Sequence, residues 1–341
     1  MVINGIKINS ILELEKQSNQ NSFDNDVSLF LKEWFSDSSF IETKTSGSTG
    51  KPKTIRLSKT SMIKSAQLTN RFFDLKKGDT VLLCLPVNFI AGKMMLVRSF
   101  EGQLKVKSVK PSLNPLKIIF DSIDFAAMTP MQVKTILMEN PEKLSLIKTL
   151  IIGGAPVDYK LEKELKKYAV KCFSTFGMTE TITHIAVKEL NKRNEYLALP
   201  TVTFQLSENN CLIINAPHIT ALPIQTNDIV NLTSSTSFVW KGRHDNVINT
   251  GGIKIFAEEL EDQLFEYIPN NRFFITSEKD NLLGEKVILI IEGNKDSKLM
   301  TLNFDKLSKY SIPKKIYFTP KFIESENGKI LKQKIKAALN S

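Results

Sequence analysis

The most informative segment of this 341-residue chain is a short loop of small and polar residues at positions 45–53. It holds hydroxyl side chains, glycines and lysines, in the order Thr45, Ser46, Gly47, Ser48, Thr49, Gly50, Lys51, Pro52 and Lys53. Glycines let the backbone come close to a ligand, and hydroxyls and lysine can bind phosphate oxygens. The loop therefore favours a polyphosphate ligand, with a ligand-free Gly/Ser/Thr turn as the alternative. It is no Walker loop, because Pro52 follows Lys51.

A second segment, Thr175–Glu180, follows an expected strand and carries residue types suited to a nucleotide. Phe176 offers an aromatic face on which adenine can stack. Thr179 can donate a hydrogen bond to a phosphate oxygen. Glu180 can hold Mg²⁺, which prefers carboxylate and phosphate oxygens. The alternative is an ordinary turn with a solvated glutamate, but the loop upstream favours a site.

Together with the segment Gly242–Gly252, these two stretches resemble, in order and spacing, the adenylate-forming superfamily. That superfamily includes acyl-CoA synthetases, luciferases and the adenylation domains of peptide synthetases. The resemblance covers roughly residues 43 to 335 and implies an enzyme that uses ATP, Mg²⁺ and CoA to convert a carboxylic acid into a thioester. The region before the loop is shorter than in full-length members, so we expect a reduced N-terminal subdomain.

The resemblance assigns roles to further residues. An adenine and ribose site is implied by Gly153, Gly154, Ala155, Pro156, Phe176, Gly177, Asp228 and Arg243. Catalytic roles are implied for Thr179, for Glu180 through the metal, and for Lys329. A hinge is implied at Asp245, and a CoA channel along Gly251 and Gly252. The alternatives are a turn aspartate at Asp228 and an ordinary surface lysine at Lys329. Glu258, Glu259 and Glu261 are expected to form a solvated helix face.

The acid substrate is constrained by residues 85–98. The segment Leu85–Gly92 holds no acidic side chain, whereas amino-acid-activating members carry an aspartate there, and Phe89 stands where many acyl-CoA ligases have a histidine. The stretch 91–98 resembles o-succinylbenzoate–CoA ligases of menaquinone synthesis, which implies that Arg98 holds the second carboxylate of a dicarboxylic acid. Lys93 and Arg98 are charges in an otherwise apolar stretch, and such an acid would supply the partner that buried charges need. The alternative is that both extend to solvent. Thr129 is expected in the acid pocket or simply as a helix start.

The order of elements predicts an α/β fold with doubly wound layers. Strands are expected at 79–85, 123–128, 150–152 and 170–174, and helices at 26–35, from Ser58 to Phe73, from Thr129 to Glu139 and at 157–168. In such sheets ligands bind beyond the carboxyl ends of the strands.

Helical periodicity is lost between Tyr196 and Trp240, where short β-type runs predict a small β-subdomain. We expect a core domain at 1–242 and a small mobile α+β domain at 243–341. The latter should hold a hairpin (247–255), an acidic helix (257–267), strands at 272–276, 286–292 and 315–318, and a C-terminal helix from Ile330.

Composition restricts the other classes. The net charge of +10 comes from scattered lysines without an aromatic-interleaved basic run, so we expect small anionic ligands and no nucleic acid. Cys84, Cys172 and Cys211 lie in apolar contexts, typical of reduced core thiols in a cytoplasmic protein. The most apolar stretch, 81–97, is interrupted by polar residues, so no membrane span is expected. The N-terminus lacks the pattern of a signal peptide. A homo-oligomer stays open.

The sequence therefore favours an ATP-dependent acid–CoA ligase, and the resemblance favours o-succinylbenzoate as its acid. The alternatives are another aryl- or acyl-CoA ligase, an adenylating enzyme that loads a carrier protein, and a nucleotide-binding regulatory protein without turnover.

Overall fold

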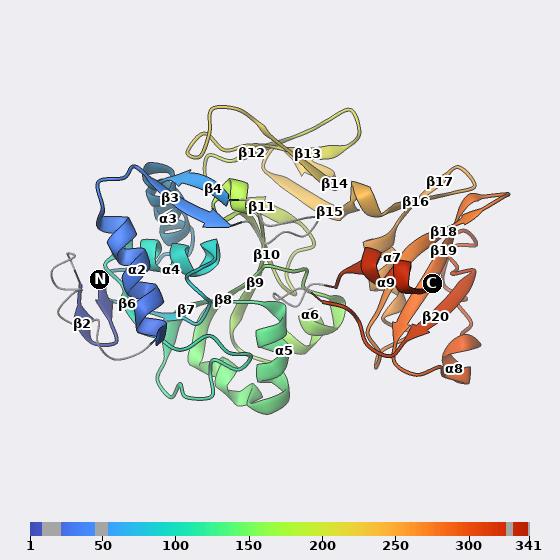
Figure 1. The fold of residues 1–341 in the computed structure, drawn as a ribbon, viewed down its shortest axis with the longest axis horizontal. Helices are drawn as coiled ribbons and strands as arrows, with labels where there is room; N and C mark the ends of the chain where they lie inside the picture. Colours follow the sequence, from blue (N-terminus) through green and yellow to red (C-terminus); the bar gives the residue numbers. More distant parts are fainter. Residues whose placement is uncertain (9–21, 45–53, 325–329, 340–341) are drawn as a thin grey trace. The chain divides into compact units, whose positions relative to one another are not determined.

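The computed structural model describes residues 1–8, 22–44, 54–324 and 330–339 (Figure 1). The chain divides into two compact units. The first comprises Met1–Val157, Leu161–Thr203 and Asn215–Ile224, and the second Asp158–Lys160, Phe204–Ile214 and Gln225–Ser341. The strands around residues 204–243 thus group with the C-terminal part, and the boundary expected after residue 242 stays a prediction about motion.

The first unit is built on a twisted mixed sheet. Its strands are hydrogen-bonded in the order β11 (Tyr196–Ala198), β10 (His184–Glu189), β9 (Lys171–Gly177), β8 (Ile147–Ile152), β7 (Ile123–Met128), β5 (Thr80–Leu83), β6 (Lys105–Ser108), β1 (Val2–Ile3) and β2 (Ile6–Lys7). Neighbours from β9 to β1 run parallel, while β10, β11 and β2 pair antiparallel with theirs. The predicted α/β class is confirmed.

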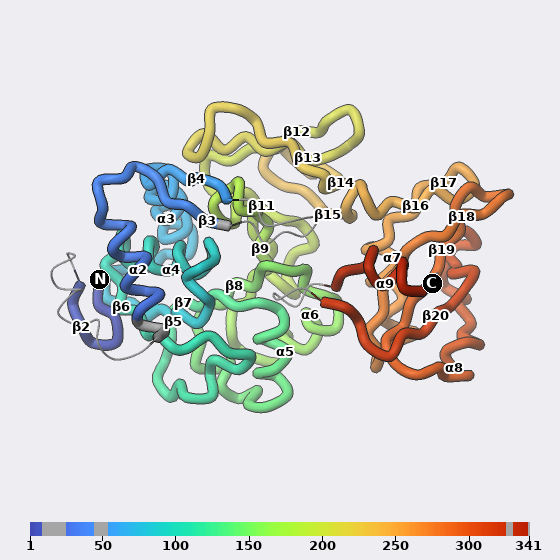
Figure 2. Tube along the Cα trace, in the orientation of Figure 1, coloured from blue at the N-terminus to red at the C-terminus, as the bar shows by residue number. Residues whose placement is uncertain are grey.

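Alternate residues of the central strands supply two separate cores. Val81, Leu83 and Phe125 join one core with residues of α2 (Ser22–Phe35), α3 (Lys59–Phe72) and α4 (Ile90–Gly102). Their neighbours Leu82 and Ala126 join another core with residues of α5 (Pro130–Glu139), η1 (Pro141–Leu146) and α6 (Tyr159–Leu165). Helices therefore cover both faces of the sheet, as parallel strands buried on both sides require (Figure 2).

Local signals fix the starts of two helices. Ser58 Oγ accepts a hydrogen bond from the backbone N–H of Ser61 at 3.4 Å, which caps α3. Thr129 caps α5 through a reciprocal capping box with Gln132, and Pro130 occupies the first helical position. Both helix starts were predicted.

A separate hairpin of β3 (Phe40–Lys44) and β4 (Thr54–Ser58) frames the polar loop. The two strands pair antiparallel, with Lys44 opposite Thr54. The predicted phosphate loop, 45–53, lies outside the described residues and joins these two paired ends.

The second unit holds two sets of hydrogen-bonded strands. In the first, β12 (Thr203–Leu206), β13 (Cys211–Asn215), β14 (Ile224–Ser234) and β15 (Ser237–Arg243) are hydrogen-bonded in that order. The second has the order β17 (Ile253–Phe256), β16 (Val247–Thr250), β19 (Gly284–Glu292), β18 (Phe273–Asp280), with β20 (Lys315–Thr319) parallel to β19. One core includes residues of α7 (Ala257–Leu264), and another includes Ile335 of α9 (Lys332–Leu339); α8 is Ser297–Met300.

The structure confirms the prediction that the three cysteines are reduced core residues. Cys84, Cys172 and Cys211 are buried and free of disulfides. Burial raises the pKa of the Cys84 and Cys172 thiols to about 12, which makes them poor nucleophiles. Across the described ranges, no helix combines the length and apolar character that a membrane crossing requires.

Candidate active site

The predicted turn Gly153–Pro156 and the predicted segment Thr175–Glu180 begin at the carboxyl ends of the adjacent parallel strands β8 and β9. The N–H of Gly153 donates to the Met128 carbonyl at 3.1 Å, which brings the turn against the end of β7. A Cβ at Gly153 would lie 2.2 Å from Thr175 Oγ1, so a larger residue there would clash with that hydroxyl. Gly154 has φ +84°, a conformation that favours glycine, and its absent Cβ would lie 3.9 Å from Thr129 Cγ2. The turn at Gly153, the segment at Thr175 and the Thr129 cap therefore form one surface.

The aromatic ring of Phe176 has an aromatic neighbour. It lies edge-on to the Tyr196 ring, with 5.8 Å between centroids. Tyr196 is itself fixed by a hydrogen bond of 2.9 Å between its hydroxyl and Ser174 Oγ. Phe176 is half-buried, so part of its surface is open to a planar ligand.

Thr179 and Glu180 lie in a single 3₁₀ turn, η2 (Thr179–Thr181), directly after β9. The buried Thr181 hydroxyl ties this turn together, because it accepts from the Met178 N–H at 2.9 Å and bonds the carbonyls of Met178 and Thr183 at 2.9 and 2.8 Å. Glu180 is exposed. Its carboxylate is thus presented on an ordered turn and is open to a hydrated cation.

The residue after this turn was missed by the sequence reasoning. Ile182 is buried and adopts φ +64° and ψ −56°, which is a strained conformation for a β-branched residue. Gly177 makes room for the returning chain, since a Cβ there would lie 2.4 Å from the Thr183 carbonyl oxygen. No sequence signal marks this strain, which depends on the packing of 182–184 back against β9.

Asp228 and Arg243 pair across neighbouring strands of the second unit. They are direct partners in the β14–β15 register. Asp228 is 7% exposed; its Oδ1 accepts from Trp240 Nε1 at 3.0 Å, and its Oδ2 lies 3.8 Å from Arg243 Nη1. The carboxylate is therefore fixed in direction, as recognition of a vicinal diol requires.

The predicted hinge residue follows at once. Asp245 lies in the turn η3 (His244–Asn246), and its carboxylate is 3.4 Å from Arg243 Nη2. Gly242 has φ +148°, and a Cβ there would lie 2.4 Å from Glu258 Oε2 of α7. That oxygen is buried and has no hydrogen-bond partner among the described residues, while Oε1 accepts from Asn246.

The glycines of the predicted CoA channel form a tight turn. Gly251 and Gly252 have φ +59° and +82° and join β16 to β17 in a two-residue hairpin. The Gly251 N–H donates to the Leu283 carbonyl at 2.8 Å. A Cβ at Gly252 would meet no atom of the described residues within 4 Å, so the backbone there is open.

Arg98 is the most unusual charged group of the first unit. It lies on α4 and is 1% exposed. Its Nη2 donates to Thr183 Oγ1 at 2.7 Å, and its Nε has no hydrogen-bond partner in the described part of the chain. Across the same ranges, no carboxylate comes within ion-pair distance of it. Burial lowers the pKa of the guanidinium to about 10, so it stays charged at neutral pH.

Lys93, the other predicted acid-binding residue, has partners within the protein. Its Nζ donates to the Glu42 carbonyl at 2.9 Å, lies 3.5 Å from Glu33 Oε2 and lies over the Phe30 ring. These contacts link α4 to α2 and β3. They give Lys93 a structural role and leave Arg98 as the stronger candidate for a substrate carboxylate.

The prediction that the glutamates of α7 form a solvated helix face is wrong. Glu259 pairs with Lys241, and Glu258 with Asn246. Glu261 Oε1 accepts from the Ile275 N–H at 2.8 Å and from Lys332 Nζ at 2.6 Å. Burial raises the pKa of the Glu261 carboxyl, and the Lys332 ammonium opposes that rise. Lys332 is the first residue of α9 and lies 71 positions from Glu261 in the sequence, so residue spacing did not predict this contact.

Two predicted groups are not described. The phosphate loop and Lys329 fall in the gaps at 45–53 and 325–329. Over the described residues, no group of three or more His, Cys, Asp or Glu side chains could hold a metal ion. A magnesium ion bound with ATP needs less, because substrate phosphates and waters supply most of its ligands. The exposed Glu180 fits that requirement.

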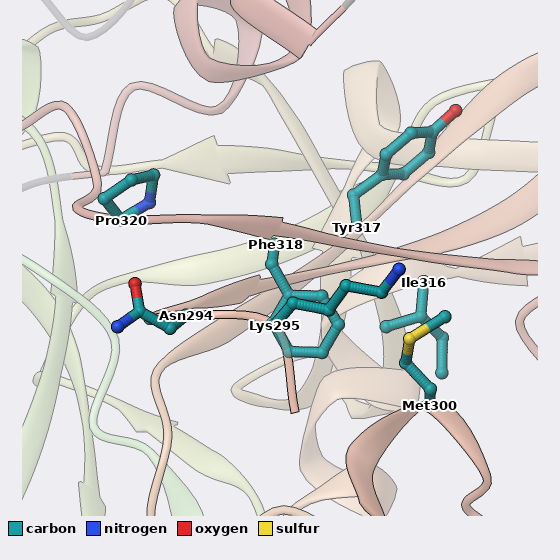
Figure 3. Close-up of a pocket in the computed structure, with 8 residues that line it drawn as sticks. Asn294, Lys295, Met300, Ile316, Tyr317, Phe318 and Pro320 are labelled. Atoms are coloured by element: carbon teal, nitrogen blue, oxygen red, sulfur yellow. The ribbon is translucent and has the colours of Figure 1, made fainter. Parts of the chain in front are cut away.

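A pocket of about 370 Å³ in the second unit contains none of the predicted site residues. Figure 3 shows the side chains around it, which come from β20 and the residue after it, from α8, and from the segment that leads into α8. Its lining residues are Gly293, Asn294, Lys295, Met300, Ile316, Tyr317, Phe318 and Pro320.

Comparison with known proteins identifies the family of the chain. Residues 40–225 match the family model of the AMP-binding enzymes. The chain is 22% identical to the 2-succinylbenzoate–CoA ligase of Haemophilus influenzae, over 83% of this chain and 67% of that protein, and 24% identical to the Escherichia coli enzyme, over 86% and 68%.

Solved structures give the same result. An acyl-CoA synthetase (AMP-forming)/AMP-acid ligase II-like protein from Dyadobacter fermentans is 32% identical with a TM-score of 0.66, covering 97% of this chain and 99% of that one. The o-succinylbenzoate CoA synthetase of Bacillus subtilis with its acyl-adenylate OSB-AMP has a TM-score of 0.75 at 20% identity, covering 86% and 68%. The chain belongs to the AMP-binding enzyme family, as an AMP-forming acid–CoA ligase.

Proposed function

We propose that this enzyme activates an aromatic dicarboxylic acid, o-succinylbenzoate, and transfers it to CoA. The observation that carries the proposal is the buried Arg98, whose charge has no carboxylate partner among the described residues. A buried charge is costly unless it is paired. A second carboxylate on the substrate would supply that pair, in the fork geometry that arginine favours.

The relatives support the same acid. Proteins named 2-succinylbenzoate–CoA ligase match this chain over more than four fifths of its length. Their identity of 22–24% supports the class of reaction more firmly than the acid, so the choice of acid rests on Arg98. Thr129 would line the acid pocket with its methyl group, since its hydroxyl serves the α5 cap.

In the first half-reaction, an oxygen of the substrate carboxylate attacks the α-phosphorus of ATP, and the bond to pyrophosphate breaks. We assign the phosphates to the loop 45–53 and Thr179, the adenine to Phe176 and the turn Gly153–Pro156, and the ribose to Asp228 and Arg243. Lys329 would stabilise the charge that builds between carboxylate and phosphate. Mg²⁺ on Glu180 would supply further positive charge to the phosphates.

In the second half-reaction, the sulfur of CoA attacks the carbonyl carbon of the acyl-adenylate. The bond to AMP breaks, and the thiol proton goes to solvent. We propose that rotation about Asp245 removes Lys329 and brings the Gly251–Gly252 turn to the thiol path, so that one site serves both steps. The open backbone of Gly252 suits a thin ligand.

Pyrophosphate release tests the proposal. With MgATP and CoA, we expect o-succinylbenzoate to be preferred over benzoate, a medium-chain fatty acid and an amino acid. Arg98→Ala should remove that preference. Formation of the CoA thioester, followed by mass spectrometry, should accompany AMP release.

The other outcomes select the alternatives. Release with a different acid would keep the ligase class and reject o-succinylbenzoate. Pyrophosphate release without CoA-dependent AMP release would indicate transfer to a carrier protein. ATP binding without release for any acid would indicate a regulatory nucleotide-binding protein.

A further inference from the structure

A chain of hydrogen bonds runs behind Arg98 through the first unit. It joins α3, α4 and the start of β10. Arg98 Nη2 lies 2.7 Å from Thr183 Oγ1, which lies 3.2 Å from His184 Nδ1. On the other side of the ring, His184 Nε2 lies 3.4 Å from Thr69 Oγ1.

The direction of each bond in this chain follows from its two ends. Thr69 Oγ1 donates its proton to the Ser65 carbonyl at 3.1 Å, so it can only accept from His184 Nε2. The ring proton therefore lies on Nε2, and Nδ1 is an acceptor. Thr183 must then donate to Nδ1, which leaves its oxygen to accept from the guanidinium. Each hydrogen bond from Arg98 to Thr69 therefore has a defined donor and a defined acceptor.

The surroundings favour this arrangement. His184 is 5% exposed and Thr69 is fully buried. Burial lowers the pKa of His184 well below its ordinary value of 6.5, and the Arg98 charge lowers it further, so the ring is neutral as the chain requires. The Asn70 side chain also donates to the Arg98 carbonyl at 2.9 Å, which fixes the backbone of α4 at the same point.

The nucleotide segment controls the position of Thr183. Thr181 Oγ1 bonds the Thr183 carbonyl, and the strained Ile182 directs the chain from Glu180 toward Thr183. The turn that presents Thr179 and Glu180 thus also fixes the acceptor for Arg98. Local strain of this kind persists only when the surrounding packing determines it.

We propose that Thr183 and His184 are positioning residues that hold the Arg98 guanidinium in one orientation, with Nε directed to a substrate carboxylate, and thereby set selectivity for a dicarboxylic acid. The inference rests on the proposed role of Arg98. With Nη2 held by Thr183, the fork keeps its Nε donor for the ligand. A freely rotating arginine would bind the same carboxylate with less geometric selectivity.

The test compares two acids that differ only at the proposed contact. The first is o-succinylbenzoate, and the second is 4-oxo-4-phenylbutanoate, which lacks the ring carboxylate. The measured quantity is the ratio of their kcat/KM values in pyrophosphate release. A general folding defect lowers both values together and leaves the ratio unchanged, whereas loss of positioning lowers the ratio through the KM of o-succinylbenzoate.

Thr183→Val keeps the shape of the side chain and removes the hydroxyl, so we expect the ratio to fall about tenfold or more, because a hydrogen bond to a charged group is lost. Thr183→Ser keeps the hydroxyl and should restore the ratio to within about threefold. Thr236→Val, at an exposed loop of the second unit, is the matched control. If circular dichroism shows that Thr183→Val folds poorly, His184→Phe offers a second test, because it breaks the same hydrogen-bond chain one bond further from Arg98. His184→Gln keeps a donor and an acceptor, so it should restore the kcat/KM ratio.

Arg98→Ala separates the two proposals. If it leaves the ratio unchanged, the proposed acid-binding role of Arg98 is wrong. If Arg98→Ala removes the preference for o-succinylbenzoate while Thr183→Val and His184→Phe keep the native kcat/KM ratio, Arg98 binds the acid without help. The positioning inference is then overturned.

Discussion

The indole N–H of Trp240 donates to Oδ1 of Asp228 at 3.0 Å from the neighbouring strand. One carboxylate oxygen is thereby fixed, and the other faces Arg243. If Asp228 binds the ribose hydroxyls, Asp228→Asn should raise the KM for ATP about tenfold, because one charge-assisted acceptor is lost. Trp240→Phe should raise it about threefold by freeing the carboxylate. Initial rates at saturating acid measure both, and an unchanged KM in Asp228→Asn would exclude this role.

Gly153 and Thr175 test how tightly the two nucleotide segments pack. Gly153→Ala places a Cβ 2.2 Å from Thr175 Oγ1. We expect a loss of about 1–3 kcal/mol in the free energy of unfolding, as is typical of overpacking. Thr175→Ala in the same chain should recover about 1 kcal/mol in a double-mutant cycle from urea unfolding. Additive effects of the two changes would show that the clash relaxes elsewhere.

Lys332 should stabilise the second unit. Lys332→Ala leaves the largely buried Glu261 carboxylate without its cation. We expect a loss of about 1–2 kcal/mol near pH 7.5, while Lys334→Ala, at an exposed position of the same helix, should cost under about 0.5 kcal/mol.

The same variant has a pH signature. Burial already raises the pKa of Glu261, and removal of Lys332 takes away the group that opposes the rise. The folded variant will therefore take up a proton more readily than the unfolded chain, so its deficit should shrink as the pH falls from 7.5 to 5. Chemical unfolding at both pH values measures this, and a constant deficit would contradict the assignment.

His184 should make stability depend on pH in the opposite sense. Its folded pKa lies well below 6.5, so the unfolded chain binds one more proton as the pH falls through 6.5. Stability should fall by about 1.4 kcal/mol between pH 7.5 and 5.5, over and above the change in His184→Gln. Equal pH dependence in the two proteins would show that His184 is protonated in the folded state or does not contribute.

Lys329 should act in one half-reaction only. Lys329→Ala is expected to slow adenylate formation by about 10²–10³-fold and to leave thioester formation from preformed acyl-adenylate close to the native rate. Quenched-flow measurement of each half-reaction checks this, with Lys334→Ala as the control. Equal losses in both steps would remove the proposed role.

Local signals explain what the sequence predicts well. The strand at 123–128 and the caps at Ser58 and Thr129 depend on neighbouring residues, and the structure confirms them. Helix ends are less well predicted. The helix expected at 157–168 is only Tyr159–Leu165, and the acidic helix ends at Leu264, because packing decides where a helix stops.

Long-range partners explain what was missed. Lys93 is predicted to bind the acid because a charge in an apolar helix needs a partner, yet Glu33 and the Glu42 carbonyl supply that partner from other elements. Arg98 finds Thr183 across 85 positions, and Lys332 finds Glu261 across 71. Pairings of this kind exist only once the sheet has formed, so residue type and spacing alone do not reveal them.

The three buried thiols give the chain a built-in set of probes. Cys84 and Cys172 lie in the core of the first unit, and Cys211 lies in the second. An alkylating reagent must wait for local opening before it can reach any of them. Labelling rates followed peptide by peptide will therefore report how often each unit opens in the native enzyme, with no engineered reporter. Saturation with ATP should slow the labelling of whichever unit binds it.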